Sequence, residues 1–190
     1  MRAPVCHLVL KRLIDLIGSS VGLLLLSPLA MAIAVAIWLT DRGSVLFRQE
    51  RAGLNGKPFV MYKFRTMKEG SESGTVVCGD PRITSAGRLL RTSSLDEIPQ
   101  LINVLKGEMS LVGPRPDRPS HAEGYSERVR GRLKMKPGIM GLAQLHHGRR
   151  LTWEERYEYD LEYVERFTIW LDLRITLASV FLARMFQREG

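Results

Sequence analysis

The sequence predicts a helix-rich α/β protein that begins with a membrane helix and continues with a small β-hairpin or sheet and interfacial amphipathic helices. Residues 13–39 are almost wholly apolar, two short strand-like runs flank a turn containing Gly and Asn, and later segments repeat apolar residues at helical spacing. The 190 residues suit one domain beside the apolar segment. We therefore expect a membrane anchor over residues 1–42 and a cytosol-facing domain over residues 43–190.

The composition indicates an anionic partner and a reducing environment. The chain has 28 Lys and Arg against 20 Asp and Glu, which gives a formal net charge of +8. A membrane surface, a nucleotide or phosphate substrate, and a nucleic acid all suit this charge, which alone does not choose among them. Cys6 and Cys78 lie far apart and outside metal-ligand or redox spacing, which argues against a disulfide framework and a zinc site.

The apolar segment contains a predicted break at Ser27 and Pro28. About 20 apolar residues suffice to cross a bilayer, and no cleavage site follows, so we expect the segment to be retained. Pro28 removes a backbone hydrogen bond near the middle, which penalises a straight helix by roughly 3 kcal/mol in water. Ser27 can bond the backbone groups that the break frees. The segment is therefore either a kinked spanning helix or a helix that turns back.

Basic residues on both sides favour the second topology. Those before the segment are Arg2, Lys11 and Arg12, and those after it are Arg42, Arg48 and Arg51. By the positive-inside rule both flanks then lie on the cytoplasmic side. A re-entrant helix broken at Ser27 and Pro28 satisfies both flanks, whereas a spanning helix satisfies only one.

Short strands and a helix follow the anchor. Residues 45–48 and 59–65 are typical of strands joined by a Gly- and Asn-containing turn, which predicts a hairpin. Apolar residues from Ile98 to 105 have the spacing of an amphipathic helix that begins within residues 94–97, and Gly107 is a stop signal.

Two further helices are expected near the C-terminus. Residues 153–164 are strongly charged with a helical pattern. Residues 167–186 are largely apolar but contain Asp172, Arg174 and Arg184, which argues against a second deep span. This last segment suits either an interfacial helix, with Trp170 at headgroup level, or a core helix of the domain.

Adjacent acids, Asp96 and Glu97, open the helix that ends at Gly107. In one interpretation Ser94 is an N-cap and Glu97 completes a capping box, while Asp96 favours the helix dipole. Pro99 weakens that interpretation, because it lies beyond the positions where a missing amide hydrogen costs nothing. In the other interpretation the start is irregular and Asp96 shares an anion site with a phosphate and a divalent ion. That arrangement suits phosphoryl chemistry.

Several cations lie near these acids in the sequence: Lys63, Arg65, Arg82, Arg88, Arg91, Arg115 and Arg118. Arg115 stands between two prolines, which fix the backbone around a guanidinium able to fork onto phosphate oxygens. The chain has no P-loop, dinucleotide fingerprint or nucleophile elbow. His146 and His147 are adjacent rather than at ligand spacing, and no basic face interleaved with aromatics indicates nucleic-acid binding.

One long pattern is specific enough to indicate a family. It comprises Arg82, Thr84, Gly87, Arg88, Leu90 and Arg91, then Leu95, Asp96, Glu97, Pro99, Gln100, Leu101 and Asn103, then Gly107, Met109, Ser110 and the turn through Pro116, with flanking segments 62–67 and 136–141. This pattern resembles the bacterial sugar transferase family, in particular its small monotopic phosphoglycosyl transferases. The resemblance covers nearly the whole chain and includes a helix break at Ser27 and Pro28.

The resemblance implies transfer of a sugar 1-phosphate from a UDP-sugar to polyprenol (undecaprenyl) phosphate, with release of UMP and with Mg²⁺ as cofactor. It implies that residues 43–190 form a catalytic domain on the cytoplasmic face of the bacterial inner membrane. Asp96 matches the nucleophile that forms a phosphosugar intermediate, and Glu97 matches its partner in metal binding or in activating the lipid phosphate. The expected substrate-binding residues are Lys63, Arg65, Arg88, Arg91, Arg115 and Asp160.

The sequence departs from the family pattern at two places. Met140 stands where Thr is common, and residues 146–149 replace a shorter segment resembling Asn-Gly-Arg. Both bear on the nucleotide or sugar pocket, and no motif specifies the sugar. A membrane-anchored scaffold whose basic face holds anionic lipid is the alternative function, against which Asp96 and Glu97 beside the cations argue.

Overall fold

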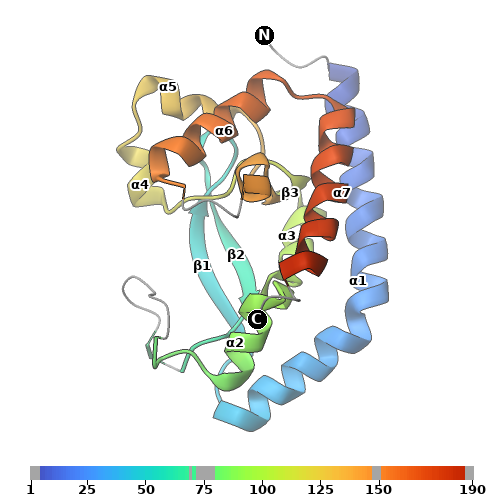
Figure 1. Cartoon of the computed structure of the whole chain (residues 1–190), viewed down its shortest axis with the longest axis vertical. Coiled ribbons are helices and arrows are strands. Elements are labelled where there is room, and N and C mark those ends of the chain that lie inside the picture. Colours follow the sequence, from blue (N-terminus) through green and yellow to red (C-terminus); the bar gives the residue numbers. More distant parts are fainter. Residues whose placement is uncertain (1–4, 69, 72–79, 147–150, 187–190) are drawn as a thin grey trace.

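The computed structural model describes residues 5–68, 70–71, 80–146 and 151–186 (Figure 1). Its helices are α1 (Val5–Asp41), α2 (Ser85–Thr92), α3 (Gln100–Lys106), α4 (Pro119–Glu123), α5 (Glu127–Arg130), α6 (Trp153–Glu165) and α7 (Ile169–Phe186). Its strands are β1 (Leu46–Ala52), β2 (Pro58–Phe64), β3 (Ser110–Val112) and β4 (Gly138–Met140), and four short 3₁₀ turns lie among them. The helix-rich fold with small sheets agrees with the sequence prediction.

The long helix α1 continues through Pro28 as a single helix, yet it changes direction sharply along its length (Figure 1). The Ser27 hydroxyl donates to the Leu24 carbonyl at 2.8 Å, a bond within the turn that precedes the proline. Residues Cys6–Thr40 form a helix long and apolar enough to cross a membrane by length and composition. Helix α1 therefore bends, as an internal proline predicts, but it does not break into two helices.

One stripe of α1 is polar and faces the rest of the protein. Lys11, Asp15 and Ser19 recur every four residues and are all buried. Asp15 accepts hydrogen bonds from the Ser110 hydroxyl and the Leu111 amide, both at 2.9 Å, which joins α1 to β3. Apolar side chains on other faces of α1 are exposed, including Ile17, Val21, Leu24, Leu25 and Met31. The N-terminal part of the helix thus presents a polar stripe to the domain, whereas farther along Ile33 and Ile37 are buried in an apolar cluster.

The strands form two separate two-stranded sheets. β1 and β2 pair antiparallel in register from Leu46 opposite Phe64 to Ala52 opposite Pro58. The connection uses positive φ at Asn55 and Gly56, residue types that tolerate this conformation. β3 and β4 pair in parallel, with Ser110 opposite Gly138. The predicted hairpin is confirmed, and its first strand runs four residues farther than expected.

The C-terminal helix α7 has one buried face and one exposed face. Ile175 is fully buried in a core cluster with Val112, Tyr163 and Phe167, so one face of α7 belongs to the core. Trp170 is 74% exposed, so another face is open. Figure 1 shows α7 running beside the upper limb of α1.

Candidate active site

The two adjacent acids lie on an irregular backbone rather than at a regular helix start. Ser94 adopts a left-handed conformation (φ 55°) and makes no side-chain cap, so the capping-box interpretation is wrong. Asp96 and Glu97 then occupy a 3₁₀ turn, Pro99 takes the cap position of α3, and Gly107 ends that helix with φ 83°. The proline thus lies where its missing amide hydrogen costs little. The irregular start that Pro99 predicts is confirmed.

Two cations converge on Glu97. Lys63 of β2 donates to Glu97 Oε1 at 2.6 Å, and Arg115 donates to the same oxygen at 2.9 Å. Lys63 Nζ also lies 4.0 Å from Asp96 Oδ2. The side chains of Asp96, Glu97 and Lys63 are each less than 20% exposed, whereas Arg115 is 45% exposed. The acids and their cations therefore form one partly buried group.

The adjacent carboxyls have pKa values shifted in opposite directions. Burial raises the pKa of Asp96, and the nearby Lys63 only partly opposes this. Burial acts in the same direction on Glu97, but the charges of Arg115 and Lys63 and their hydrogen bonds outweigh it and lower its pKa to about 2. Asp96 is therefore the more basic carboxylate, and Glu97 is the one fixed as an anion. Carboxyl pairs whose pKa values are shifted in opposite directions are typical of sites where the two groups have distinct chemical roles.

These residues line a cavity of about 630 Å³. Of the residues predicted from sequence, the cavity brings together Asp96, Glu97, Lys63, Arg65, Arg91, Arg115 and Asp160. Arg91 Nε donates to the Thr66 hydroxyl at 2.8 Å, which fixes the arginine at the wall. Arg88 does not join them: its side chain is exposed on α2, and it is not among the described residues of the cavity wall.

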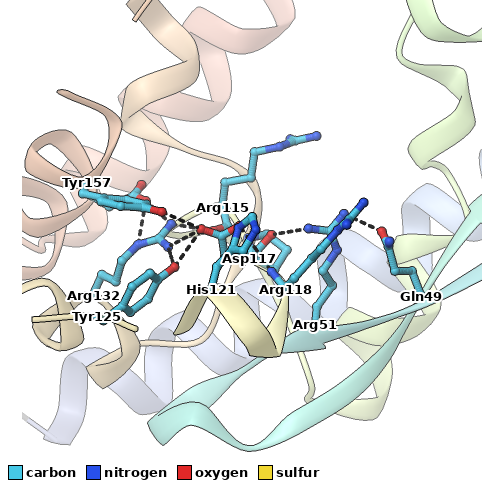
Figure 2. Close-up of polar contacts among 11 residues, drawn as sticks. Gln49, Arg51, Arg115, Asp117, Arg118, His121, Tyr125, Arg132 and Tyr157 are labelled. Carbon is cyan, nitrogen blue, oxygen red and sulfur yellow. Dashed lines mark hydrogen bonds and ion pairs between the residues drawn. The ribbon is translucent and has the colours of Figure 1, made fainter. Parts of the chain in front are cut away.

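A buried network of hydrogen bonds holds the backbone of the turn that contains Arg115. Arg132 donates through Nε to Asp160 Oδ2 at 3.0 Å and through Nη2 to the backbone carbonyl of Arg115 at 2.6 Å. Asp117 accepts from the Tyr125 hydroxyl at 2.8 Å and the Tyr157 hydroxyl at 3.0 Å (Figure 2). Burial raises the pKa of Asp160 to about 6, with Arg132 opposing the shift.

No sequence pattern distinguishes Arg132, Asp117, Tyr125 or Tyr157 as site residues. Arg132 belongs to a stretch of several basic residues, and nothing in the local pattern distinguishes the buried one. Its partner Asp160 was identified only through the family resemblance. The one local signal was the turn containing Arg115, whose backbone Arg132 holds.

The carboxylate pair is compatible with Mg²⁺. Among the described residues no group of three or more His, Cys, Asp and Glu side chains is arranged to hold a metal. Mg²⁺ commonly binds through one or two carboxylates together with substrate phosphates rather than in an all-protein cage. Asp96 and Glu97 at the wall of a cavity with nearby cations fit that type of site.

Of the two departures from the family pattern, only the first lies wholly within the described residues. Met140 ends β4 and packs against the core cluster around Val112. His146 ends a 3₁₀ turn, and residues 147–149 lie outside the described residues.

Comparison with known proteins places this geometry in context. A family model described as bacterial sugar transferase matches residues 6–185. A UDP-glucose:undecaprenyl-phosphate glucose-1-phosphate transferase of Klebsiella pneumoniae is 46% identical over 186 residues, which are 92% of this chain and 40% of that protein. The sugar transferase EpsL of Bacillus subtilis (strain 168) is 42% identical over 91% of this chain and 86% of its own length.

A relative named for a different sugar is also similar. The UDP-N-acetylgalactosamine-undecaprenyl-phosphate N-acetylgalactosaminephosphotransferase of Aeromonas hydrophila is 37% identical over 90% of this chain and 43% of its own length. The chain thus spans less than half the length of the Klebsiella and Aeromonas relatives. Because the family model covers almost all of its residues, the chain belongs to the bacterial sugar transferase family.

Proposed function

We propose that the protein transfers a sugar 1-phosphate from a UDP-sugar to polyprenol phosphate and releases UMP. The single observation that carries this proposal is the pair of carboxyl groups of Asp96 and Glu97, whose pKa values are shifted in opposite directions. Lys63 and Arg115 lie beside this pair at the wall of a cavity. The names of the Klebsiella and Aeromonas relatives support the same donor and acceptor classes.

In the first step Asp96 acts as the nucleophile. A carboxylate oxygen of Asp96 forms a bond to the sugar-bearing phosphorus of the UDP-sugar, and the bond from that phosphorus to the bridging oxygen breaks. UMP leaves with the electron pair, and an acyl phosphate, the mixed anhydride of Asp96 and the sugar phosphate, remains. The raised pKa of Asp96 supports this role, because a more basic carboxylate is a better nucleophile when it is ionised.

In the second step the lipid takes the group from Asp96. A phosphate oxygen of polyprenol phosphate forms a bond to the same phosphorus, the bond to Asp96 breaks, and the carboxylate is regenerated. The product is a polyprenyl diphosphate sugar. Two displacements at one carboxylate let both phosphate substrates use the same cationic cavity in turn.

Glu97 and the cations position and neutralise the phosphates. Lys63 and Arg115 are held by the Glu97 carboxylate, so their charges are fixed in place before substrate arrives. Mg²⁺, bound by Asp96 and Glu97 together with substrate phosphate, would neutralise further phosphate charge.

We propose that α1 enters the membrane and returns to the cytoplasmic face of the bacterial inner membrane. The bend, the apolar outer surface and the basic flanks support this topology. Cys6 is exposed before the apolar segment, which permits a test in a Cys78→Ser background. A membrane-impermeant maleimide should label both Cys6 and an Arg48→Cys variant lacking Cys6 from the cytoplasmic side only. Labelling of the two positions from opposite sides would establish a spanning helix.

Release of UMP tests the reaction. The protein in nanodiscs with Mg²⁺ and polyprenol phosphate is mixed with a panel of UDP-sugars that includes UDP-glucose and UDP-N-acetylgalactosamine. We expect release with at least one sugar, loss of release in Asp96→Asn, and full release in Glu158→Gln, whose side chain is 55% exposed outside the cavity. A sugar-phosphoryl adduct on Asp96 should be detectable by mass spectrometry when the lipid is omitted.

The alternative functions give different results in the same assay. A scaffold that merely holds anionic lipid releases no UMP from any donor, while its membrane binding survives in Asp96→Asn. A hydrolase releases sugar phosphate continuously without polyprenol phosphate, whereas the proposed transferase without lipid releases at most one UMP per enzyme.

A further inference from the structure

Two arginines that are not among the expected substrate-binding residues line the same cavity. Arg51 of β1 and Arg118, which follows the turn that contains Arg115, line the cavity together with Arg115 (Figure 2). Arg51 Nη1 donates to the Pro116 carbonyl at 3.3 Å, so the strand and the turn are in direct contact. Three arginine side chains thus line the cavity that Glu97 also lines.

The nearby acids do not neutralise this group. Glu97 accepts from both Lys63 and Arg115. Asp117 accepts from two tyrosine hydroxyls and lies 3.5 Å from the buried Arg132. The carboxylates beside the arginines are therefore each shared with other donors, and the group retains excess positive charge. Like charges held together at a cavity wall are costly unless an anion binds between them.

Arg51 has unused bonding capacity. Its Nη2 donates to Gln49 Oε1 at 2.5 Å, but its Nε is buried and has no hydrogen-bond partner among the described residues. A buried donor without a partner is unfavourable, and an incoming acceptor removes that cost. Burial, together with the charge of Arg115, lowers the pKa of Arg51, which is consistent with a cation that lacks compensation.

The geometry of β1 aims Arg51 at the cavity. Side chains alternate along a strand, and Phe47, Gln49 and Arg51 line the cavity, whereas Arg48 and Glu50 are exposed and lie outside it. The same strand thus offers Arg48 as a matched arginine that does not face the cavity.

We propose that Arg51, with Arg118 and Arg115, binds the phosphate that stays with the nucleotide. This inference rests on the proposed function and assigns a place to the second phosphate of the donor. Arg115 contacts Glu97, and Arg51 contacts the carbonyl of the adjacent Pro116, so the turn that contains Arg115 connects the carboxylates to the new subsite. The transferred phosphorus is then at Asp96 and the nucleotide phosphate is toward β1.

The subsite also assists departure of the nucleotide. When the bridging bond breaks, the leaving oxygen of UMP gains negative charge. Fixed guanidinium donors at that oxygen stabilise the charge as it develops. The phosphate of polyprenol phosphate has the same chemistry, so the experiment must separate the two sources.

Direct binding of UMP to the Asp96→Asn protein tests the subsite without turnover. The chain has three tryptophans, and only Trp153 among them lines the cavity, so its fluorescence reports occupancy and a Trp153→Phe variant gives the background signal. We expect Arg51→Gln to raise the Kd for UMP at least about tenfold, as for loss of a charge-assisted hydrogen bond. Arg48→Gln should leave it unchanged, and Arg51→Gln should not alter the Kd for uridine.

Steady-state kinetics then separate nucleotide from lipid. In Arg51→Gln the KM for the UDP-sugar and the inhibition constant of UMP should rise by similar factors, while the KM for polyprenol phosphate stays constant. A change confined to the KM for polyprenol phosphate would assign Arg51 to the acceptor and overturn the proposal. An unchanged Kd for UMP would overturn it as well.

Folding and the covalent route are controlled separately. Circular dichroism checks the fold of Arg51→Gln, and Arg51→Lys, which keeps the charge but loses Nε, should show a partial loss of UMP affinity in the same assay. If Asp96→Asn still turned over while UMP binding depended on Arg51, the covalent route would fail and the subsite would stand. If Asp96→Asn were inactive but UMP bound equally to all variants, the covalent route would stand and the subsite would fail.

Discussion

Two lysine–carboxylate pairs in this protein have the same separation and different surroundings. Lys11 of α1 lies 2.6 Å from Asp172 of α7, and Lys63 of β2 lies 2.6 Å from Glu97. Lys11 also donates to the Val112 carbonyl, and Asp172 accepts from the Tyr163 hydroxyl at 2.7 Å. The first pair is enclosed by its own partners, whereas the second faces a cavity that contains further cations.

The first pair attaches two helices to each other, whereas the second lies at the candidate active site. The enclosed pair connects α1 to α7 across 161 residues of sequence, and each of its groups is satisfied within the protein. The cavity pair leaves Lys63 within 4.0 Å of Asp96 as well, so its charge can be shared with a substrate. An ion pair is therefore informative about function through what else its members contact, and its length alone says little.

Breaking the enclosed pair should have the largest effect on stability. Lys11→Met leaves Asp172 buried with its tyrosine partner but without a cation, and loss of one member of a buried pair costs about 3–5 kcal/mol. Thermal unfolding followed by circular dichroism in detergent measures this loss. Arg166→Gln, which removes an exposed pair with Glu162, should cost less than about 1 kcal/mol.

A double variant sharpens that result. Lys11→Met combined with Asp172→Leu removes both charges, so much of the lost stability should return if the cost arises from the unpaired acid. An equal loss in the single and double variants would instead assign the cost to packing of α1 against α7.

Breaking the cavity pair should affect turnover more than stability. Lys63→Met removes a preorganised cation beside both acids, and such losses reduce kcat by about 10²–10³. Lys57→Met, on the exposed turn of the same hairpin, should leave UMP release unchanged. Steady-state UMP release with both variants measures the difference, and equal rates would remove Lys63 from the reaction.

Local patterns predicted the elements better than the contacts between them. The hairpin, a bend in α1 and the end of α3 at Gly107 each depend on a few neighbouring residues, and all are present. The pairing of Lys11 with Asp172 and of Arg132 with Asp160 depends on tertiary packing, and among 28 basic residues the sequence contains no signal for either. Family resemblance identified Asp160, but the role of its partner required the structure.

The smallest predicted effect contrasts the two adjacent acids. The lowered pKa of Glu97 means that its ionised form stabilises the native state above its ordinary pKa of 4.5, and that this stabilisation disappears as the pH falls toward 2. The raised pKa of Asp96 has the opposite sign, so native stability decreases as the pH rises through its ordinary value of 3.8. At neutral pH, Asp96→Asn should therefore raise the melting temperature and Glu97→Gln should lower it.

Each shift should be about 2–4 °C for a change of 1 kcal/mol in a chain of this size. Both substitutions remove one negative charge and replace a carboxylate by an amide, so a general effect of net charge would move both melting temperatures in the same direction. Melting curves measured between pH 4 and pH 8 distinguish the two cases. Melting temperatures that change in opposite directions at neutral pH would show that the cavity stabilises the charge of Glu97 while it keeps Asp96 basic. A nucleophile beside a fixed anion requires these two different environments.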